Sequence, residues 1–165
     1  MAQGVHKITE DFERALCDYT GAPYAIALDN MSNALFLSLY YEKNIKNGID
    51  TDTITIPSRT YPSVPCEIIH VGLKVKFIPV DGEKIKGAYQ LVGSNIYDSA
   101  LRFTCNMYIP QTHMCVSFTG PYKHLKLGKG GAILTDDENA YKWFKKARFS
   151  GRDECSYHND DFDPL

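Results

Sequence analysis

The sequence has no long hydrophobic segment, little net charge and no paired cysteines, and each absence excludes a class of protein. No apolar run approaches the roughly 20 residues that span a bilayer, and the amino-terminal residues contain no apolar signal core. The formal charge is −2, which argues against bulk attraction to nucleic acid or anionic lipid. The five cysteines are widely spread, as is typical of reduced thiols. We therefore expect a soluble cytoplasmic protein without a membrane or nucleic-acid partner.

Three common ligand-binding motifs are also missing. The segment Gly120–Lys129 contains glycines and lysines, but its spacing is wrong for a phosphate-binding P-loop and no Ser or Thr follows its last lysine. No Gly-x-Gly-x-x-Gly fingerprint is present, which argues against a nicotinamide site. His113 with Cys115, and Cys155 with His158, have passable spacing for metal ligands, but nothing joins them into a four-ligand set. No metal site is therefore expected.

What is present is an alternation of apolar runs and amphipathic stretches. Hydrophobic residues make up 44% of the 165 residues and charged residues 23%, enough for one packed domain. The patterns predict helices over residues 8–19, 32–46, 62–72 and 136–149. They predict strands over residues 24–28, 53–56, 75–80, 91–97, 114–118 and 131–135. This order predicts a three-layer α/β sandwich with a mostly parallel sheet over residues 1–150, followed by a polar tail over 151–165.

Polar residues follow several predicted strands, where ligands gather in open α/β sheets. The turn Asp29–Leu35 leads into a helix, and a helix N-terminus suits a phosphate. Ser32 can add a hydroxyl there, although the turn can equally be an ordinary N-cap. Asp98 ends an apolar strand, where it can hold a ring nitrogen protonated or simply cap a turn. Tyr61 lies in a loop and can stack on a flat ring, although loop tyrosines more often serve packing.

The most informative stretch runs from Cys115 to Gly131. A strand ends at Ser117, a loop carries Lys123, and a glycine-rich turn leads into the next strand. Burial near other cations lowers the pKa of a lysine and frees its amine as a nucleophile. A reactive lysine, an acid, a flat aromatic partner and phosphate donors are the groups that a pyridoxal 5′-phosphate (PLP) enzyme needs from its protein. The set of segments therefore indicates a PLP site.

The ordered set of motifs resembles the DegT/DnrJ/StrS-type sugar aminotransferase family, whose members are fold-type I PLP enzymes. The segments that carry the resemblance, in chain order, are Phe12-Glu13, Asn30–Leu35, Ile56–Tyr61, Ile78–Asp81, Asp98–Ala100, Ser117-Phe118, Lys123–Leu125, Gly128–Gly131 and Thr135–Asp137. The resemblance covers the chain from Phe12 to about Asp153. It implies the large domain of such an enzyme, shortened between Asp81 and Asp98 and without the small C-terminal domain.

The resemblance also implies a role for each candidate residue. Lys123 would form the Schiff base with PLP and move the proton during transfer, and Asp98 would pair with the pyridine nitrogen. Tyr61 would stack on the ring. The phosphate would be held by Ser117 and by the turn Met31-Ser32. The substrates would be a nucleotide-linked keto-sugar and an amino-acid donor, glutamate or glutamine, and the protein would form a homodimer or pair with a C-terminal half.

Two positions depart from the family pattern. Met31 stands where a glycine is usual, which removes conformational freedom from the turn. Leu101 stands where a glutamine usually contacts the cofactor's ring oxygen. Two function classes therefore stay open. The chain is an aminotransferase, or it is a PLP-binding or assembly module that keeps the fold without turnover.

Overall fold

The computed structural model describes residues 6–80 and 87–153. The helices are α1 (Lys7–Thr20), α2 (Met31–Tyr40), the π-helical continuation η1 (Tyr41–Ile45), α3 (Ser63–His70) and α4 (Glu138–Ala147). The strands are β1 (Tyr24–Leu28), β2 (Thr53–Pro57), β3 (Lys74–Ile78), β4 (Tyr89–Gln90), β5 (Ile96–Asp98), β6 (His113–Ser117) and β7 (Gly131–Thr135). None of the described helices is both long and apolar enough to cross a membrane.

The strands form a mixed sheet that is partly parallel. Five strands pair in the order β1-β7-β6-β5-β4, and β2 pairs with β3 beside them. Within the five-stranded sheet only β5 and β6 pair in parallel, whereas β2 and β3 form a second parallel pair. An antiparallel bridge between Thr55 and Val92 links the two groups. Among the described strands, β1, β2, β3, β5 and β6 run in one direction and only β4 and β7 oppose them. The predicted α/β sandwich is thereby confirmed, with a mixed sheet in which most strands run in one direction.

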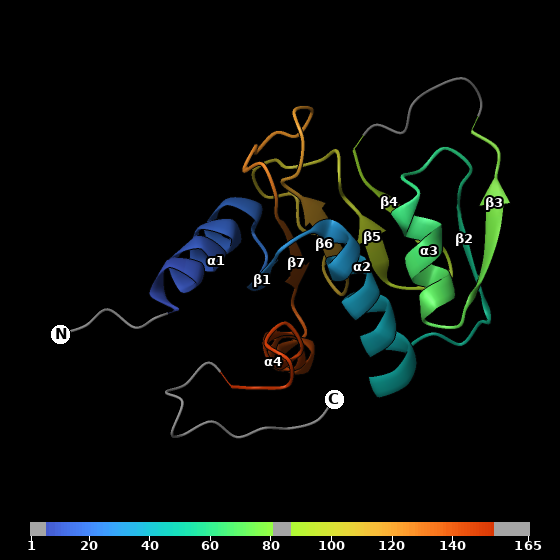
Figure 1. Cartoon of the computed structure of the whole chain (residues 1–165), viewed down its shortest axis with the longest axis horizontal. Coiled ribbons are helices and arrows are strands. Elements are labelled where there is room, and N and C mark those ends of the chain that lie inside the picture. The colour runs from blue at the N-terminus through green and yellow to red at the C-terminus, as the bar shows by residue number, and fades with distance from the viewer. Residues whose placement is uncertain (1–5, 81–86, 154–165) are drawn as a thin grey trace.

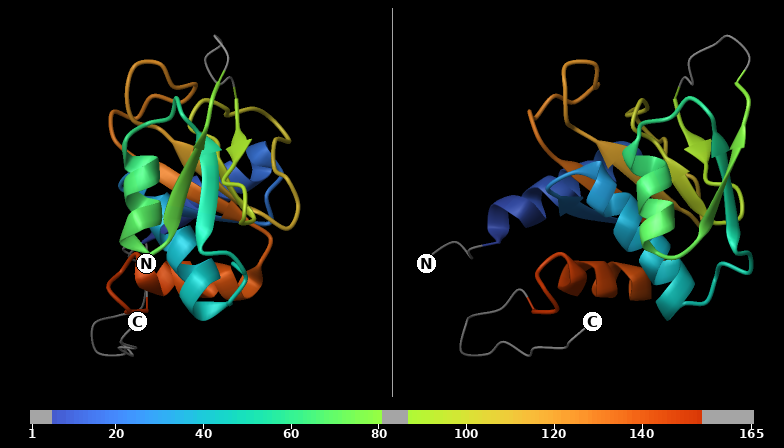
Figure 2. Two further views of the ribbon diagram at one scale, coloured as in Figure 1. Left: turned by 90° about the vertical axis from the view of Figure 1, so that its right-hand side faces the viewer. Right: turned by 45° about the vertical axis from the view of Figure 1, so that its right-hand side comes forward.

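Each face of the sheet is buried under a separate layer. Ile26, Cys115 and Ile133 point to one face and pack with residues of α2, α3 and α4. Their strand neighbours point to the other face, where Leu16 of α1 and Met107 cover them. Alternate side chains of a strand point to opposite faces, so burial on both sides explains why these strands consist of continuous apolar runs. Figures 1 and 2 show the layers, with α2 and α3 side by side.

Local signals set the helix ends. Gly21 ends α1 with a left-handed backbone (φ 78°), and its N–H donates to the Cys17 carbonyl. The Asn30 side chain caps α2 by accepting the Asn33 N–H at 2.8 Å. Asp137 caps α4 by accepting the N–H groups of Asn139 and Ala140. The four predicted helices are therefore confirmed, with their ends displaced by a few residues.

One predicted strand is wrong in part. Residues 91–97 were expected to be continuous, but the chain turns between Leu91 and Ile96, so that β4 and β5 form an antiparallel hairpin. Gly93 has a φ of 106° there, which glycine adopts easily, and the Ser94 N–H and hydroxyl both donate to the Leu91 carbonyl. Leu91 and Ile96 are both fully buried. Two apolar residues on either side of the turn therefore made the hairpin resemble a single strand in the sequence. In the predicted tail, only Gly151–Asp153 are described, so Cys155 and His158 lie outside the described residues.

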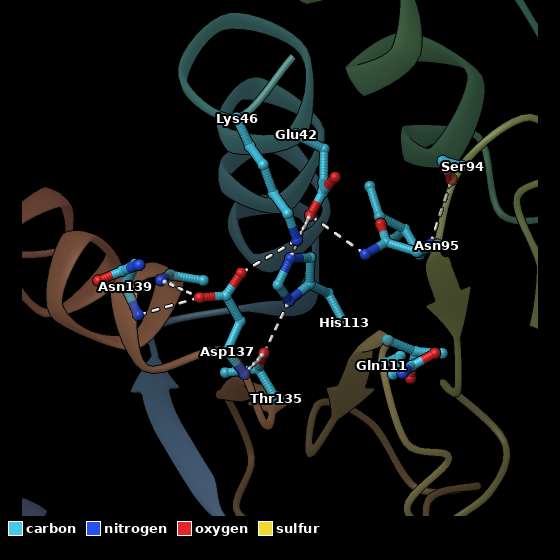
Figure 3. Close-up of polar contacts among 12 residues, drawn as sticks. Glu42, Lys46, Ser94, Asn95, Gln111, His113, Thr135, Asp137 and Asn139 are labelled. Carbon is cyan, nitrogen blue, oxygen red and sulfur yellow. Dashed lines mark hydrogen bonds and ion pairs between the residues drawn. The ribbon is translucent and has the colours of Figure 1, made fainter. Parts of the chain in front are cut away.

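A buried polar network joins the helices to the amino-terminal end of β6. His113, at the start of β6, contacts Glu42 through Nε2 at 2.7 Å and the Thr135 hydroxyl through Nδ1 at 3.0 Å. The Asn95 amide donates to the same Glu42 oxygen at 3.1 Å, and Lys46 approaches it at 3.3 Å. Figure 3 shows the side chains of His113, Asn95 and Lys46 directed toward the Glu42 carboxylate.

The network extends from Glu42 to the cap of α4. Lys46 also contacts the Asp137 carboxylate at 3.0 Å. Burial alone would raise the pKa of Glu42, but the hydrogen bonds from His113 and Asn95 and the charge of Lys46 hold that pKa below its ordinary value. The Glu42 carboxylate is therefore a buried charge whose partners stabilise its ionised form.

Candidate active site

Asp98 is a buried carboxylate at the carboxyl end of β5. Its side chain is 5% exposed. One carboxylate oxygen accepts the Ala100 N–H at 2.8 Å, and the other accepts the Tyr89 hydroxyl at 2.8 Å. Burial raises the pKa of Asp98, while these two donors and the nearby Lys123 ammonium act in the opposite direction. Each oxygen can accept a further hydrogen bond, so the carboxylate can still receive a cationic N–H group.

Lys123 lies in a loop that reaches back to the segment after β5. The loop is closed at its base, where the Phe118 N–H donates to the Gly130 carbonyl at 2.9 Å and the Leu127 N–H donates to the Phe118 carbonyl at 3.1 Å. Figure 1 shows it as the orange loop beyond β6. The Lys123 ammonium donates to the Ala100 carbonyl at 2.8 Å, two residues after Asp98. Burial lowers the pKa of Lys123, which the charge of Asp98 partly offsets.

The predicted phosphate groups come from two segments that flank Gly131. Gly131 pairs with Leu28 at the end of β1 and with Ser117 at the end of β6. A Cβ at Gly131 would lie 2.5 Å from backbone atoms of Asn30 and Met31, so only glycine allows this approach. Ser117 is half-buried, and its hydroxyl accepts the Thr119 N–H at 3.4 Å.

The turn before α2 departs from a simple phosphate cup. Met31 is buried and Ser32 is half-buried, and Asn30 already satisfies one N–H group of the first turn. An ordinary N-cap, one of the two roles that the sequence allowed for this turn, is therefore present. Whether the rest of the turn also binds phosphate stays a prediction.

Tyr61 and Tyr89 differ in their exposure and in their contacts. The Tyr61 side chain, predicted to stack on a ring, is 73% exposed, and its stacking role stays a prediction. Tyr89, which sequence reasoning missed, donates its hydroxyl to Asp98 and contacts the Thr60 hydroxyl. Thr60 precedes Tyr61 in the same loop. The signal for Tyr89 was its pairing with Asp98 across the β4–β5 hairpin, which depends on a turn that the sequence pattern concealed.

The residues present fit PLP in their chemistry. A lysine amine of lowered pKa lies beside a buried carboxylate that retains acceptor capacity. The buried Ser99 hydroxyl, next to Asp98, has no hydrogen-bond partner within residues 6–80 and 87–153. A cavity of about 560 Å³ lies elsewhere, between α1, α2 and the end of α4, and borders the α2 turn through Asp29 and Asn33. This cavity is lined by neither Asp98 nor Lys123.

The fold and the order of these residues agree with comparisons to known proteins. The sequence model of the DegT/DnrJ/EryC1/StrS aminotransferase family matches residues 3–99, more than half of the chain. The chain belongs to this family. The match ends just after Asp98, so membership in the DegT family rests on the segment up to β5. A search of curated protein sequences gave no match.

Solved structures show the same fold over nearly the whole chain. Helicobacter pylori PseC, an aminotransferase of pseudoaminic acid biosynthesis, is similar with a TM-score of 0.72 at 15% identity, over 99% of this chain and 53% of that chain. The GDP-4-keto-6-deoxymannose-3-dehydratase ColD, as an H188N mutant with bound GDP-perosamine, gives 0.68 at 16% identity, over 88% and 48%. The sugar aminotransferase CalS13 of Micromonospora echinospora gives 0.67 at 16% identity, over 93% and 53%.

These similarities concern the fold, because the identities are low. This DegT family chain spans about half the length of the solved chains that it matches. The expected fold class is thereby confirmed. The similarity to PseC extends over 99% of this chain, so it includes Asp98 at the end of β5 and the loop after β6 that carries Lys123.

Proposed function

We propose that this chain binds PLP through Lys123 and Asp98 and takes part in amino transfer to a keto group of a nucleotide-linked sugar. The observation that carries the proposal is the Lys123 ammonium held 2.8 Å from the Ala100 carbonyl, beside the buried Asp98 carboxylate. Family membership supports the same cofactor and reaction class.

Each residue has a defined task in this proposal. Asp98 would hold a proton on the pyridine nitrogen, because an ionised carboxylate in a buried site stabilises a cationic N–H partner. Lys123 would supply the amine that attaches the cofactor and would later carry a proton to and from the substrate carbon. Ser32 and Ser117 would hold the phosphate with the N-terminus of α2, and Tyr61 would cover the ring. The cofactor would supply an electron sink when bound.

The sugar, the amino donor and the partner belong to the same proposal. Glutamate or glutamine would provide the amino group. A homodimer, or a C-terminal half supplied by another chain, would complete the contacts that the longer solved chains have in their remaining half. Size-exclusion chromatography with light scattering measures whether the chain forms a dimer alone.

A cofactor titration tests the proposal. The purified chain with added PLP should develop the yellow absorbance band of a lysine-bound cofactor, and Lys123→Ala should lack it. Lys126→Ala is the matched control, because Lys126 is an exposed lysine of the same loop and should keep the band. A folded parent without any band would refute cofactor binding, and a band that persists in Lys123→Ala would assign the attachment to another lysine.

The second candidate is a PLP-binding or assembly module without turnover. Leu101, at the position where relatives use a glutamine, is 45% exposed and cannot donate a hydrogen bond to the cofactor. A single-turnover assay with glutamate separates the two candidates. Loss of the yellow band on adding the donor supports amino transfer, whereas a stable band supports the binding module.

A further inference from the structure

The Asp98 carboxylate is the end of a chain of hydroxyl groups. Tyr89, on β4, has one hydroxyl hydrogen and donates it to Asp98 at 2.8 Å. The Tyr89 oxygen also contacts the Thr60 hydroxyl. Because the Tyr89 hydrogen is already used, Thr60 must be the donor in that contact. The hydrogen bonds therefore run in one direction, from the Thr60 hydroxyl through the Tyr89 hydroxyl to the Asp98 carboxylate.

This series of hydrogen bonds, Thr60–Tyr89–Asp98, is called the relay below. It joins three segments around the candidate cofactor position. Thr60 belongs to the loop after β2, Tyr89 to β4 and Asp98 to the end of β5. Hydrogen bonds to an ionised acceptor are stronger than neutral ones, and chains of them reinforce one another. The relay can therefore hold both the orientation of the carboxylate and the loop that carries Tyr61.

The relay leaves room for a ligand on Asp98. One carboxylate oxygen accepts only the Ala100 N–H and the other only the Tyr89 hydroxyl, among the described residues. A carboxylate offers about four acceptor positions. The other titratable groups near Asp98 are Lys123, from the loop after β6, and the Cys115 thiol of β6. Lys123 is the only cation in this set, and it rests on the Ala100 carbonyl.

We infer that Tyr89, supported by Thr60, is a positioning residue that keeps Asp98 ionised and oriented for the pyridine nitrogen of the cofactor. The inference rests on the proposed function for the identity of the ligand, but the relay itself is a property of the cofactor-free protein. Tyr89 acts through Asp98 and needs no contact with the cofactor.

The test compares two tyrosines on the same hairpin. Tyr89→Phe removes the relay hydroxyl and keeps the ring. Tyr97→Phe is the matched control, because among the described residues the Tyr97 hydroxyl contacts only Gln90, at 3.5 Å. Two quantities are measured. They are the titration midpoint of the Asp98 carboxyl carbon by NMR in the cofactor-free protein, assigned with Asp98→Asn, and the PLP dissociation constant by absorbance.

Tyr89→Phe should raise the Asp98 midpoint by about one pH unit and weaken PLP binding about tenfold, as expected for losing a hydrogen bond to a charged group. Tyr97→Phe should change neither quantity. Thr60→Val should shift both in the same direction by less, and it replaces Tyr89→Phe as the test if circular dichroism shows that variant to be unfolded.

The outcomes separate this inference from the proposed function. An unchanged Asp98 midpoint in a folded Tyr89→Phe protein, or an equal shift in Tyr97→Phe, overturns the relay whatever the parent does with PLP. A parent that binds no PLP, while Tyr89→Phe still shifts Asp98, overturns the proposed cofactor and leaves the relay as a device that sets the charge of Asp98.

Discussion

Two buried carboxylates, at opposite ends of the same strands, differ in how they are paired. Glu42 is 2% exposed and Asp98 is 5% exposed. Glu42 meets an imidazole, an amide and an ammonium group, and its pKa is held below the ordinary value. Asp98 meets one backbone N–H and one phenol, and burial raises its pKa. Two carboxylates of similar burial therefore have pKa values shifted in opposite directions.

The difference indicates which end of the sheet serves stability and which serves binding. His113 begins β6 at the Glu42 end, and Ser117 ends β6 near the candidate site. The Glu42 end ties η1, β6, β7 and the cap of α4 together. The Asp98 end keeps unused acceptor capacity on both carboxylate oxygens, as expected where ligands bind at carboxyl ends of strands.

Removing the better-paired carboxylate should have the largest effect. Glu42→Ala leaves His113, Asn95 and Lys46 without their shared acceptor, and each buried hydrogen-bonding group left unsatisfied costs about 1–3 kcal/mol. Urea unfolding monitored by circular dichroism measures this loss. The control is Glu138→Ala, which removes an exposed pair with Lys142 and should cost less than about 0.5 kcal/mol. Similar losses in both variants would contradict the structural role of the network.

Lowering the pH should change the stability that the two carboxylates contribute in opposite directions. Because the pKa of Glu42 is lowered in the folded protein, its stabilisation is present above the ordinary glutamate pKa of about 4.3 and is lost as the pH falls through the lowered value. Asp98 has a raised pKa, so acid should favour the fold at that position. The free energy of unfolding, measured against pH, should decline less steeply on the acid side in Glu42→Gln than in the parent. An equally steep decline would assign the acid sensitivity to other groups, Asp137 first among them.

Asp98→Asn should separate stability from binding. The substitution removes a buried carboxylate, and burial has raised the pKa of that group. The free energy of unfolding should therefore change by less than about 1 kcal/mol or should increase. PLP binding should be lost, because an amide cannot balance the charge of a protonated ring nitrogen. Thermal unfolding and the absorbance titration measure the two effects. A large loss of stability would make Asp98 a structural residue like Glu42.

The smallest effect is expected at Ser99. Its hydroxyl is buried without a partner among the described residues, so Ser99→Ala removes an unsatisfied polar group. The cofactor-free protein should be unchanged or more stable by up to about 1 kcal/mol. Ser38→Ala is the matched control, because that buried hydroxyl contacts the Cys115 thiol and its removal should be destabilising. A destabilised Ser99→Ala protein would indicate a contact that the hydroxyl makes in solution.

The sequence predicted the parts of the fold that depend on local periodicity. Strands buried on both faces appear as uninterrupted apolar runs, which is why β1 and β7 were placed with the correct bounds. The β4–β5 hairpin was missed because the buried Leu91 and Ile96 flank Gly93-Ser94 closely enough to resemble a single strand.

The sequence suggested candidate residues for the site but not the contacts that support them. Asp98 and Lys123 were proposed from their positions after strands and from the family resemblance, and their roles toward a cofactor stay predictions. The structure places the Lys123 amine 2.8 Å from the carbonyl oxygen of Ala100, two positions beyond Asp98. Tyr89 was missed because its contact follows from the hairpin register. The Glu42–His113 contact joins residues 71 positions apart, and no local pattern carries such a pairing.

The π-helical turn η1 makes the Glu42 network sensitive to the number of residues in that turn as well as to the identity of its side chains. Its bond from the Lys46 N–H to the Tyr41 carbonyl spans five residues at 2.9 Å, where an α-helix would span four. Each residue of an α-helix advances the chain by about 100° around the axis. Deleting the exposed Asn44 would leave every network side chain in the sequence, yet it would turn Lys46 away from Asp137. In this fold one additional residue in η1 sets the direction from which Lys46 reaches the cap of α4.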